Sequence, residues 1–258
     1  MTSNRRLGQD AQGEVLTIQR FVTDDAPAVR IQAAQALAHV GIPQSELLQI
    51  LVELLQDEHD DVHHAAGELF MLVRPREATV PHLTRLIEGE DVATVLRAAH
   101  LLSRFDRVAK SAVPALVKAT ARLGEQDAQA VLPKALGVIG ESAGEDIIAG
   151  LAASQYPETT LRRYVDALIL IGPDAISSLA NALSHTSPQV RSGAVLTLGA
   201  SGKSAGHLVL KIITLLDDDD AVVRASAAGA LGKLGPIARA AAPILAGKLN
   251  DKVSRVRA

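Results

Sequence analysis

The chain has 258 residues, of which 48% are hydrophobic, yet it contains only 3 Phe, 2 Tyr and no Trp. Its core must therefore consist mainly of Ala, Leu, Val and Ile, a composition that favours close-packed helices over sheets. The absence of cysteine excludes disulfides, thiol nucleophiles and Cys-ligated zinc or iron–sulfur sites. With 26 Lys and Arg against 29 Asp and Glu, the net charge of −3 gives no overall field that would hold a phosphate backbone.

The polar segment 1–13 contains Gly8 and Gly13 and is expected to form a flexible leader. No apolar run follows its basic pair, Arg5 and Arg6, so the segment does not resemble a secretory signal. No uninterrupted apolar stretch approaches the roughly 20 residues of a membrane span. We therefore expect a cytoplasmic protein that makes no membrane contact.

A single phrase recurs along the rest of the chain. It reads DDAPAVRIQAAQALAHVG at 24–41 and DDDAVVRASAAGALGKLG at 218–235. Alignment on the arginine of this phrase defines what we call the Arg position of each repeat. The eight Arg positions are Arg30, His63, Val95, Gln129, Leu161, Arg191, Arg224 and Arg257, with successive spacings of 30 to 34 residues. Such regularity indicates a repeat architecture.

Each repeat is expected to contain two helices. Apolar residues three, six, seven and ten positions after the Arg position form one helical stripe, which predicts the second helix of the repeat. That helix often ends at a glycine in the left-handed conformation, namely Gly41, Gly140, Gly172, Gly202 or Gly235. Shorter amphipathic segments predict the first helices, most clearly at 47–55, 80–87, 113–123, 176–183, 208–216 and 244–249. Pro81, Pro114, Pro173 and Pro243 lie at or just before the starts of first helices, where proline is tolerated.

A helical pair of about 33 residues buries both of its faces only by stacking on its neighbours. The sequence therefore predicts an all-α fold, a right-handed α-solenoid in a single domain over residues 14–258, with an incomplete last repeat. The expected repeat boundaries are 14–43, 44–75, 76–108, 109–141, 142–172, 173–203, 204–236 and 237–258.

The phrase at 218–235, together with Val-Pro-x-Leu at 80–83 and 113–116, resembles HEAT repeats of the short, phycobilin-lyase-like kind. The resemblance extends over residues 14–258. It implies a solenoid used mostly for binding, and it leaves the function open because one fold serves many functions. Ankyrin repeats are excluded by the missing Thr-Pro-Leu-His phrase, and tetratricopeptide repeats by the scarcity of aromatic residues.

An aspartate six residues before the Arg position, here called the Asp position, is expected to stabilise the turn and the neighbouring repeat. The sequence predicts a structural ladder of such residues: Asp24, Arg30, Asp57, Arg191, Asp218, Arg224, Asp251 and Arg257. Repeats 3 to 5 lack both members in register, which predicts an interrupted ladder. In repeat 2, His63 takes the place of the arginine.

Candidate chemistry is weak. His59, His63 and His64 are close to several aspartates, but they are explained by the turn and the Arg position, so no metal site is predicted. Deoxyhypusine hydroxylase is similar to this family and holds iron through His-Glu dipeptides, none of which occurs here. A DNA glycosylase, which would need basic and aromatic side chains, is disfavoured. We predict no catalytic residue, no cofactor and no nucleic-acid partner.

The second helices are expected to line the concave face of the solenoid. The positions five residues after the Arg position, here called the second-helix track, read Gln35, Glu68, His100, Lys134, Asp166, Leu196 and Gly229. With residues beside the track, the predicted binding set is His64, Glu68, Arg97, His100, Arg104, Lys134, Arg163 and Asp166. Repeats 6 and 7 expose small residues that would let a partner approach closely: Ser192, Gly193, Gly199, Ala225, Ser226 and Gly229.

These patterns favour a non-enzymatic interaction or scaffold module that grips a protein or peptide on its concave face. The alternative, implied by the resemblance, is a lyase-like protein that handles a tetrapyrrole chromophore. A third hypothesis is end-to-end self-association through the C-terminal repeat, whose second helix stops at Ala258 without its apolar stripe.

Overall fold

The structure is a computed structural model that describes residues 13–123, 130–140, 143–153 and 158–257. The described residues are helices and turns, and no strand occurs among them. Residues 1–12 of the expected leader, Gln129 at the fourth Arg position and Ala258 lie outside the described residues. Gly13, which was expected in the leader, is the first described residue of a helix over 13–20.

The helices form two compact units, Met1–Ala112 and Val113–Ala258. The α-helices of the first unit are α2 (Pro27–Val40), α3 (Gln44–Leu55), α4 (Asp60–Leu72), α5 (Val80–Ile87) and α6 (Val92–Ser103). Those of the second are α7 (Val113–Arg122), α9 (Val131–Ile139), α10 (Ala143–Ala153), α11 (Glu158–Ile171), α12 (Ile176–Ala182), α13 (Pro188–Ala200), α14 (Val209–Thr214), α15 (Ala221–Leu234), α16 (Ala242–Lys248) and α17 (Ser254–Arg257).

Short 3₁₀ helices complete the described connections. They are η1 (Phe21–Thr23), η2 (Arg76–Ala78), η3 (Asp106–Ala112), η4 (Gly172–Ala175), η5 (Gly202–Leu208), η6 (Leu215–Asp217) and η7 (Gly235–Ala241). The predicted first helices are confirmed: the range 80–87 is reproduced by α5, and α3 begins three residues before the predicted start, at Gln44.

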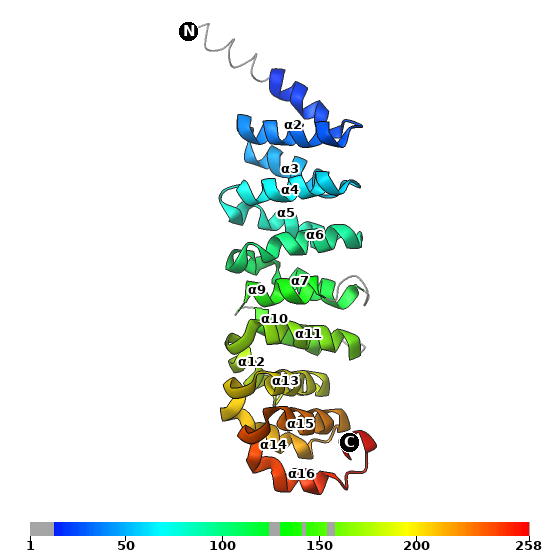
Figure 1. The fold of residues 1–258 in the computed structure, drawn as a ribbon, viewed down its shortest axis with the longest axis vertical. Coiled ribbons are helices and arrows are strands. Elements are labelled where there is room, and N and C mark those ends of the chain that lie inside the picture. Colours follow the sequence, from blue (N-terminus) through cyan, green and yellow to red (C-terminus); the bar gives the residue numbers. More distant parts are fainter. Residues whose placement is uncertain (1–12, 124–129, 141–142, 154–157, 258) are drawn as a thin grey trace. The chain divides into compact units, whose positions relative to one another are not determined.

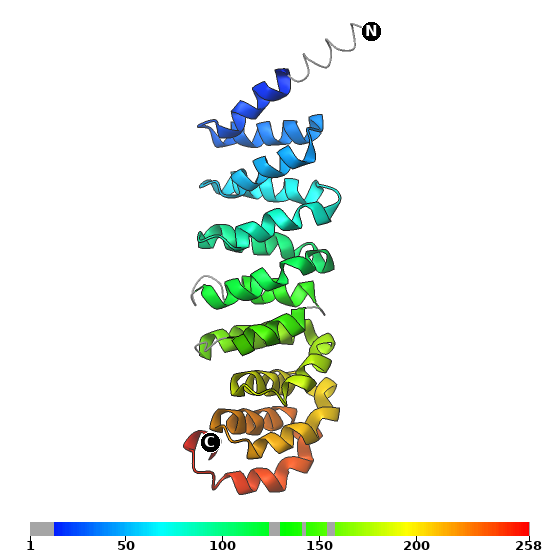
Figure 2. The same cartoon turned by 180° about the vertical axis from the view of Figure 1, so that it is seen from behind.

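Within each unit the helices stack as an α-solenoid. The second helices α2 and α4 pack against each other in the first unit, and α9, α11, α13 and α15 pack in chain order in the second unit. The first helices α7, α10 and α12 form a neighbouring row (Figures 1 and 2). Residues of the predicted apolar stripe are buried between these rows, for example Leu37, Phe70, Leu136 and Leu198. The all-α solenoid predicted from the repeats is therefore confirmed.

The position eleven residues after the Arg position has a left-handed backbone in six of the repeats. The five predicted glycines there, Gly41, Gly140, Gly172, Gly202 and Gly235, all have positive φ. In repeat 3 the same position holds Asp106, with φ of 51°, a conformation that aspartate tolerates better than most residues. This residue turns the chain from a second helix towards the next first helix.

By length and composition alone, one described stretch could cross a membrane. Residues Thr160–Ala182 form a 23-residue helical run that contains an 18-residue window with a mean hydropathy of 1.2. The left-handed Gly172, with φ of 73°, divides this run into α11 and α12, which belong to the packed solenoid. A core helix of a soluble protein passes the same test, so the finding is weak support for a span.

Gly199 lets α13 and α15 approach closely. A Cβ atom at Gly199 would lie 2.7 Å from both Cα and Cβ of Ala230 on α15, closer than carbon atoms pack. By contrast, Gly229 on α15 has nothing within 4 Å of such an atom. The helix contact therefore requires a glycine at position 199 and does not require one at position 229.

We expect Gly199→Ala to lower the free energy of unfolding by about 1–2 kcal/mol, because overpacking in a buried contact outweighs the gain in helix propensity. Gly229→Ala should raise it by about 0.5–1 kcal/mol, since it removes backbone freedom from the unfolded chain without a clash. Urea unfolding of both variants measures the difference. Equal effects of the two substitutions would contradict the close approach.

Candidate functional site

The ladder arginine of repeat 1 links two consecutive repeats. Arg30 is buried, and its Nη1 donates to the backbone oxygens of Asp24 at 2.7 Å and Asp25 at 3.1 Å. Its Nη2 donates to Oδ1 of Asp57 at 2.8 Å, in the turn of repeat 2. The arginine therefore binds the carbonyls of its own turn and the carboxylate of the next turn along the chain.

Repeats 6 and 7 have the same geometry. Arg191 donates to both carboxylate oxygens of Asp218, at 2.8 and 2.7 Å, and Arg224 to both oxygens of Asp251, at 2.9 and 3.1 Å. Each also donates to the carbonyl at its own Asp position, Arg191 to His185 and Arg224 to Asp218. A bidentate arginine–carboxylate pair fixes geometry as well as charge. The ladder thus ties each of these turns to the next one.

The ladder lowers the pKa of its carboxyl groups. Burial alone would raise the pKa of Asp218, but the hydrogen bond from Arg191 and the backbone N–H of Asp220 lower it below 3.8 overall. The pKa of Asp57 is lowered in the same way against burial, by Arg30 and by the N–H of His59. The hydrogen bond from Arg224, with the N–H of Val253, lowers the pKa of Asp251 to about 2.

Arg97 and Arg163 belong to the turns rather than to an exposed binding face. Arg163 is buried, and its Nη1 donates to the carbonyls of Thr120 at 2.8 Å and Leu123 at 2.7 Å, where α7 ends. Arg97 is half-buried, and it donates to the carbonyls of Leu55 at 3.1 Å and Asp57 at 3.4 Å, where α3 ends. The expectation that both side chains contact a partner is corrected, because their guanidinium groups are directed inward.

These two arginines compensate for missing ladder members. Asp57 and Leu123 occupy the Asp positions of repeats 2 and 4, whose Arg positions are His63 and Gln129. The arginine that binds their carbonyls comes from the following repeat, two residues beyond its own Arg position. The interruption predicted for the middle of the ladder therefore does not leave these two turns without an arginine.

The first unit exposes a small charged group on the second helices. His64, Glu68 and His100 are exposed; the last two belong to the track, and His64 lies beside it. Nη1 of Arg104, the residue that follows α6, donates to Oε1 of Glu68 on α4 at 2.7 Å, with both side chains exposed. This hydrogen bond lowers the pKa of Glu68. Lys134 on α9 and Asp166 on α11 are exposed at the equivalent positions of the second unit.

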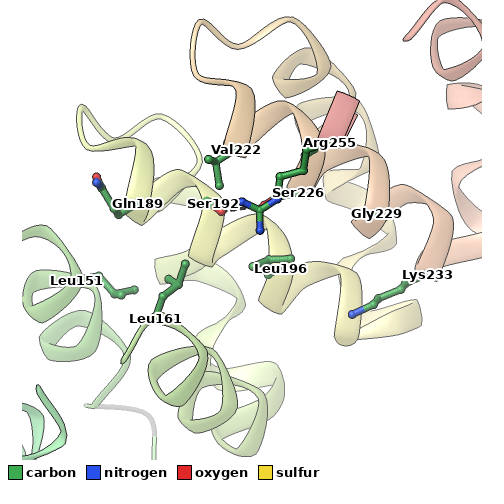
Figure 3. A pocket seen from close by; sticks show the side chains of 11 residues that line it. Leu151, Leu161, Gln189, Ser192, Leu196, Val222, Ser226, Gly229, Lys233 and Arg255 are labelled. Atoms are coloured by element: carbon green, nitrogen blue, oxygen red, sulfur yellow. Dashed lines mark hydrogen bonds between the residues drawn. The ribbon is translucent and has the colours of Figure 1, made fainter. Parts of the chain in front are cut away.

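A pocket of about 450 Å³ opens on the second helices of the second unit (Figure 3). It includes the last two members of the track, Leu196 on α13 and Gly229 on α15. Its other lining residues are Leu151, Leu161, Gln189, Ser192, Val222, Ala225, Ser226, Lys233 and Arg255. Leu161, at the fifth Arg position, lies in the apolar part of the wall with Leu151 and Leu196 (Figure 3).

Two buried serines bridge α13 and α15 in this pocket. The hydroxyl oxygens of Ser192 and Ser226 lie 2.8 Å apart and share a hydrogen bond, and both residues are buried. The Arg255 side chain extends from α17 towards them (Figure 3). The lining also contains the exposed Lys233, and no acidic residue is found among the described part of the lining.

Sequence reasoning found part of this pocket. Of the small residues predicted to form a trough, Ser192, Ala225, Ser226 and Gly229 line it, whereas Gly193 and Gly199 are buried in helix packing. It missed the apolar wall formed by Leu151 and Leu161 and the cations Lys233 and Arg255. The apolar wall could have been inferred from Leu161, because the same position holds arginine in four other repeats.

Polar residues also gather elsewhere in the first unit, at the first rung of the ladder and around His63. An open pocket of about 510 Å³ in the first unit is lined by Asp24, Asp25, Arg30, Glu53, Asp57 and Glu58, among others, and it includes the first rung of the ladder. Among the described residues, no cluster of three or more His, Cys, Asp or Glu could hold a metal ion. His63 Nε2 lies 3.1 Å from Oδ1 of Asp60 on its own helix.

Stacked helical pairs with linked turns define an α-solenoid. The family description "HEAT repeats" matches residues 7–71, and "HEAT repeat" matches residues 208–238. Both matched segments of the chain are HEAT repeats. No curated protein sequence matches it.

Solved structures support the fold. Kap121p bound to Nup53p is 14% identical with a TM-score of 0.58, and Kap121p bound to RanGTP is 15% identical with a TM-score of 0.55. Each match covers 95% of this chain and 32% of that chain, so this chain spans less than half of either structure. Human deoxyhypusine hydroxylase in complex with glycerol is 16% identical over 97% of this chain and 94% of that chain. Its TM-score of 0.37 is too low to establish a shared fold.

Arg163→Met should lower the free energy of unfolding by about 2–3 kcal/mol, because the buried carbonyls of Thr120 and Leu123 lose their charged donor. Arg162→Met, which changes the exposed neighbour, should alter it by less than about 0.5 kcal/mol. Denaturant unfolding compares the two variants. A similar effect of both would show that the buried contacts contribute little.

The ladder should make stability depend on pH. A carboxyl group whose pKa is lower in the folded state stabilises the fold above its ordinary pKa, and this contribution disappears as the pH falls. The Asp251 contribution should thus be complete above about pH 5 and decline towards its folded pKa of about 2. The difference in unfolding free energy between the parent protein and Asp251→Asn should shrink over that range.

The matched control is Asp219→Asn, which changes an exposed carboxylate in the adjoining turn. It should leave the pH dependence of stability as in the parent protein. Urea unfolding at intervals between pH 3 and pH 6 checks both variants. A constant difference between parent and Asp251→Asn across this range would contradict the assignment.

Proposed function

We propose that this protein is a non-enzymatic interaction module that binds a protein or peptide along the exposed face of its second helices. The observation that carries the proposal is the pocket of about 450 Å³ on the second helices of the second unit. Binding pockets of small ligands have volumes of about 300–1,000 Å³, so this pocket is large enough to receive part of a partner.

Exposed residues beside or on the track support binding to the second helices in each unit taken by itself. His64, Glu68, His100 and Arg104 would contact a partner in the first unit, and Lys134 and Asp166 in the second. Exposed charges of both signs fix the register of a partner and reject wrong ones, while apolar pockets supply most of the affinity. In the second unit, Lys134, Asp166 and the pocket residues Leu196 and Gly229 occupy equivalent positions on consecutive helices that pack together.

HEAT solenoids are in general used for interactions, which supports a scaffold rather than an enzyme. The phycobilin-lyase-like alternative stays a prediction. In that case the pocket described above would be the place for the chromophore. The alternative predicts bilin absorbance after co-expression with a phycobiliprotein and its chromophore. A colourless protein under those conditions would exclude it.

We expect exchange of the two charges on the second-helix face to abolish partner binding. The variant Lys134→Glu with Asp166→Lys keeps the net charge and reverses the local pattern on α9 and α11. Recovery of partners by affinity capture from native lysate should fall about tenfold or more, because like charges then face each other across the interface. Quantitative mass spectrometry of captured proteins gives the readout.

The control exchanges two exposed charges on first helices of the same repeats, Lys118→Glu on α7 with Glu145→Lys on α10. It should capture the same partners as the parent protein. Thermal unfolding of both double variants verifies that they fold alike. Unchanged capture by the second-helix variant, or equal loss in both, would refute the assigned face.

A further inference from the structure

We propose that the pocket on α11, α13, α15 and α17 binds a partner segment in which a large apolar side chain lies next to an acidic residue. This inference rests on the proposed function, because it names the chemistry of the segment that the module would bind. The segment belongs to another protein.

The wall of the pocket offers a site for one apolar side chain. Leu151 and Leu161 face Leu196 across the space in Figure 3, and Val222 and Ala225 continue the wall on α15. Val222 is 43% exposed, so part of its side chain is accessible from the pocket. Burial of these side chains by a leucine, isoleucine, methionine or phenylalanine would remove apolar surface from water on both sides.

The serine pair offers a hydrogen-bond donor. Ser192 and Ser226 together have two hydroxyl hydrogens, and the hydrogen bond between their oxygens uses one of them. The second hydroxyl hydrogen can therefore be donated to a ligand at the pocket. An acceptor from outside the chain, such as a carboxylate oxygen, satisfies it, and a charged acceptor makes the stronger hydrogen bond.

The charges select a carboxylate as that acceptor. Lys233 and Arg255 both line the pocket, and none of the lining residues that the structure describes carries a carboxylate. The guanidinium of Arg255 is directed towards the serine pair, so a single carboxylate could accept from both (Figure 3). Apolar wall, hydroxyl donor and two cations together match an apolar side chain with an acidic neighbour.

Gly229 explains how a chain could come this close, and it provides the test. A side chain at Gly229 would project into open space without contact with the protein itself, so substitution there fills the pocket and leaves the fold intact. Gly232, on the same helix, is equally open but does not line the pocket. The two glycines therefore form a matched pair for a blocking experiment.

The experiment is a selection of random twelve-residue peptides displayed on phage, with the full chain as bait. Peptides enriched on the parent protein should contain Leu, Ile, Met or Phe adjacent to Asp or Glu. Their enrichment should fall about tenfold or more on Gly229→Gln, since one central buried anchor carries a large part of the binding energy. Gly232→Gln should select the same peptides as the parent protein.

A second variant tests the charge. Lys233→Glu should keep the apolar residue in the selected peptides and lose the preference for acidic neighbours, because a carboxylate then lines the pocket. Its control, Lys211→Glu, reverses an exposed charge on the first helix α14 and should leave the preference unchanged.

The outcomes separate this inference from the proposed function. Peptides that are lost on the variant Lys134→Glu with Asp166→Lys but kept on Gly229→Gln would support the binding face and overturn the pocket. The inference is also overturned if no peptides are enriched, or if the enriched peptides lack acidic residues. Sedimentation of the chain as a dimer that Gly229→Gln dissociates would assign the pocket to a second copy instead, and would overturn it as well.

Discussion

The bond between an arginine and the backbone carbonyls of a turn holds the repeats in register. The end of a helix leaves carbonyl oxygens without partners, and a solenoid repeats that problem at every first helix. In repeats 1, 6, 7 and 8 the arginine of the same repeat donates to the carbonyl at the Asp position. In repeats 2 and 4, Arg97 and Arg163 of the next repeat do so. In these six repeats the same carbonyl accepts from an arginine, although the arginine comes from different positions of the repeat.

These bonds explain how far the sequence predicts the structure. The helices and left-handed glycines follow from local periodicity, which a single chain displays directly. The ion pairs connect one repeat with the next: Asp57, Asp218 and Asp251 each accept from the arginine of the preceding repeat. Inspection of each repeat by itself therefore does not predict them. Repeat 6 holds His185 instead of an aspartate, and the Arg position before it is Leu161. The sequence predicts that the side chain of Arg163 lies on an exposed face, but it is buried. Its position depends on the end of α7, whose carbonyls accept hydrogen bonds from it.

The pocket was predictable only in part for the same reason. Small residues on α13 and α15 recur at helical spacing, so the sequence indicates them. Leu151 comes from a first helix and Arg255 from a helix of four residues, and neither position is marked by the repeat pattern. Their convergence depends on the packing of four repeats. The spacing of residues along a single helix does not predict which residues of different repeats come together.

Leu161 connects the ladder with the pocket. An arginine at that position would bring a third cation and its need for a carboxylate partner to the wall that Leu151 and Leu196 now form. Because position 161 holds leucine, the turn of repeat 6 needs no aspartate to pair with an arginine. His185 occupies the Asp position there, and its ring nitrogen accepts the N–H of Ser187. The local loss of one ion pair therefore leaves an apolar wall between turns that remain ordered. Interruption of the ladder at repeat 5 is thus the structural condition for a pocket on this face.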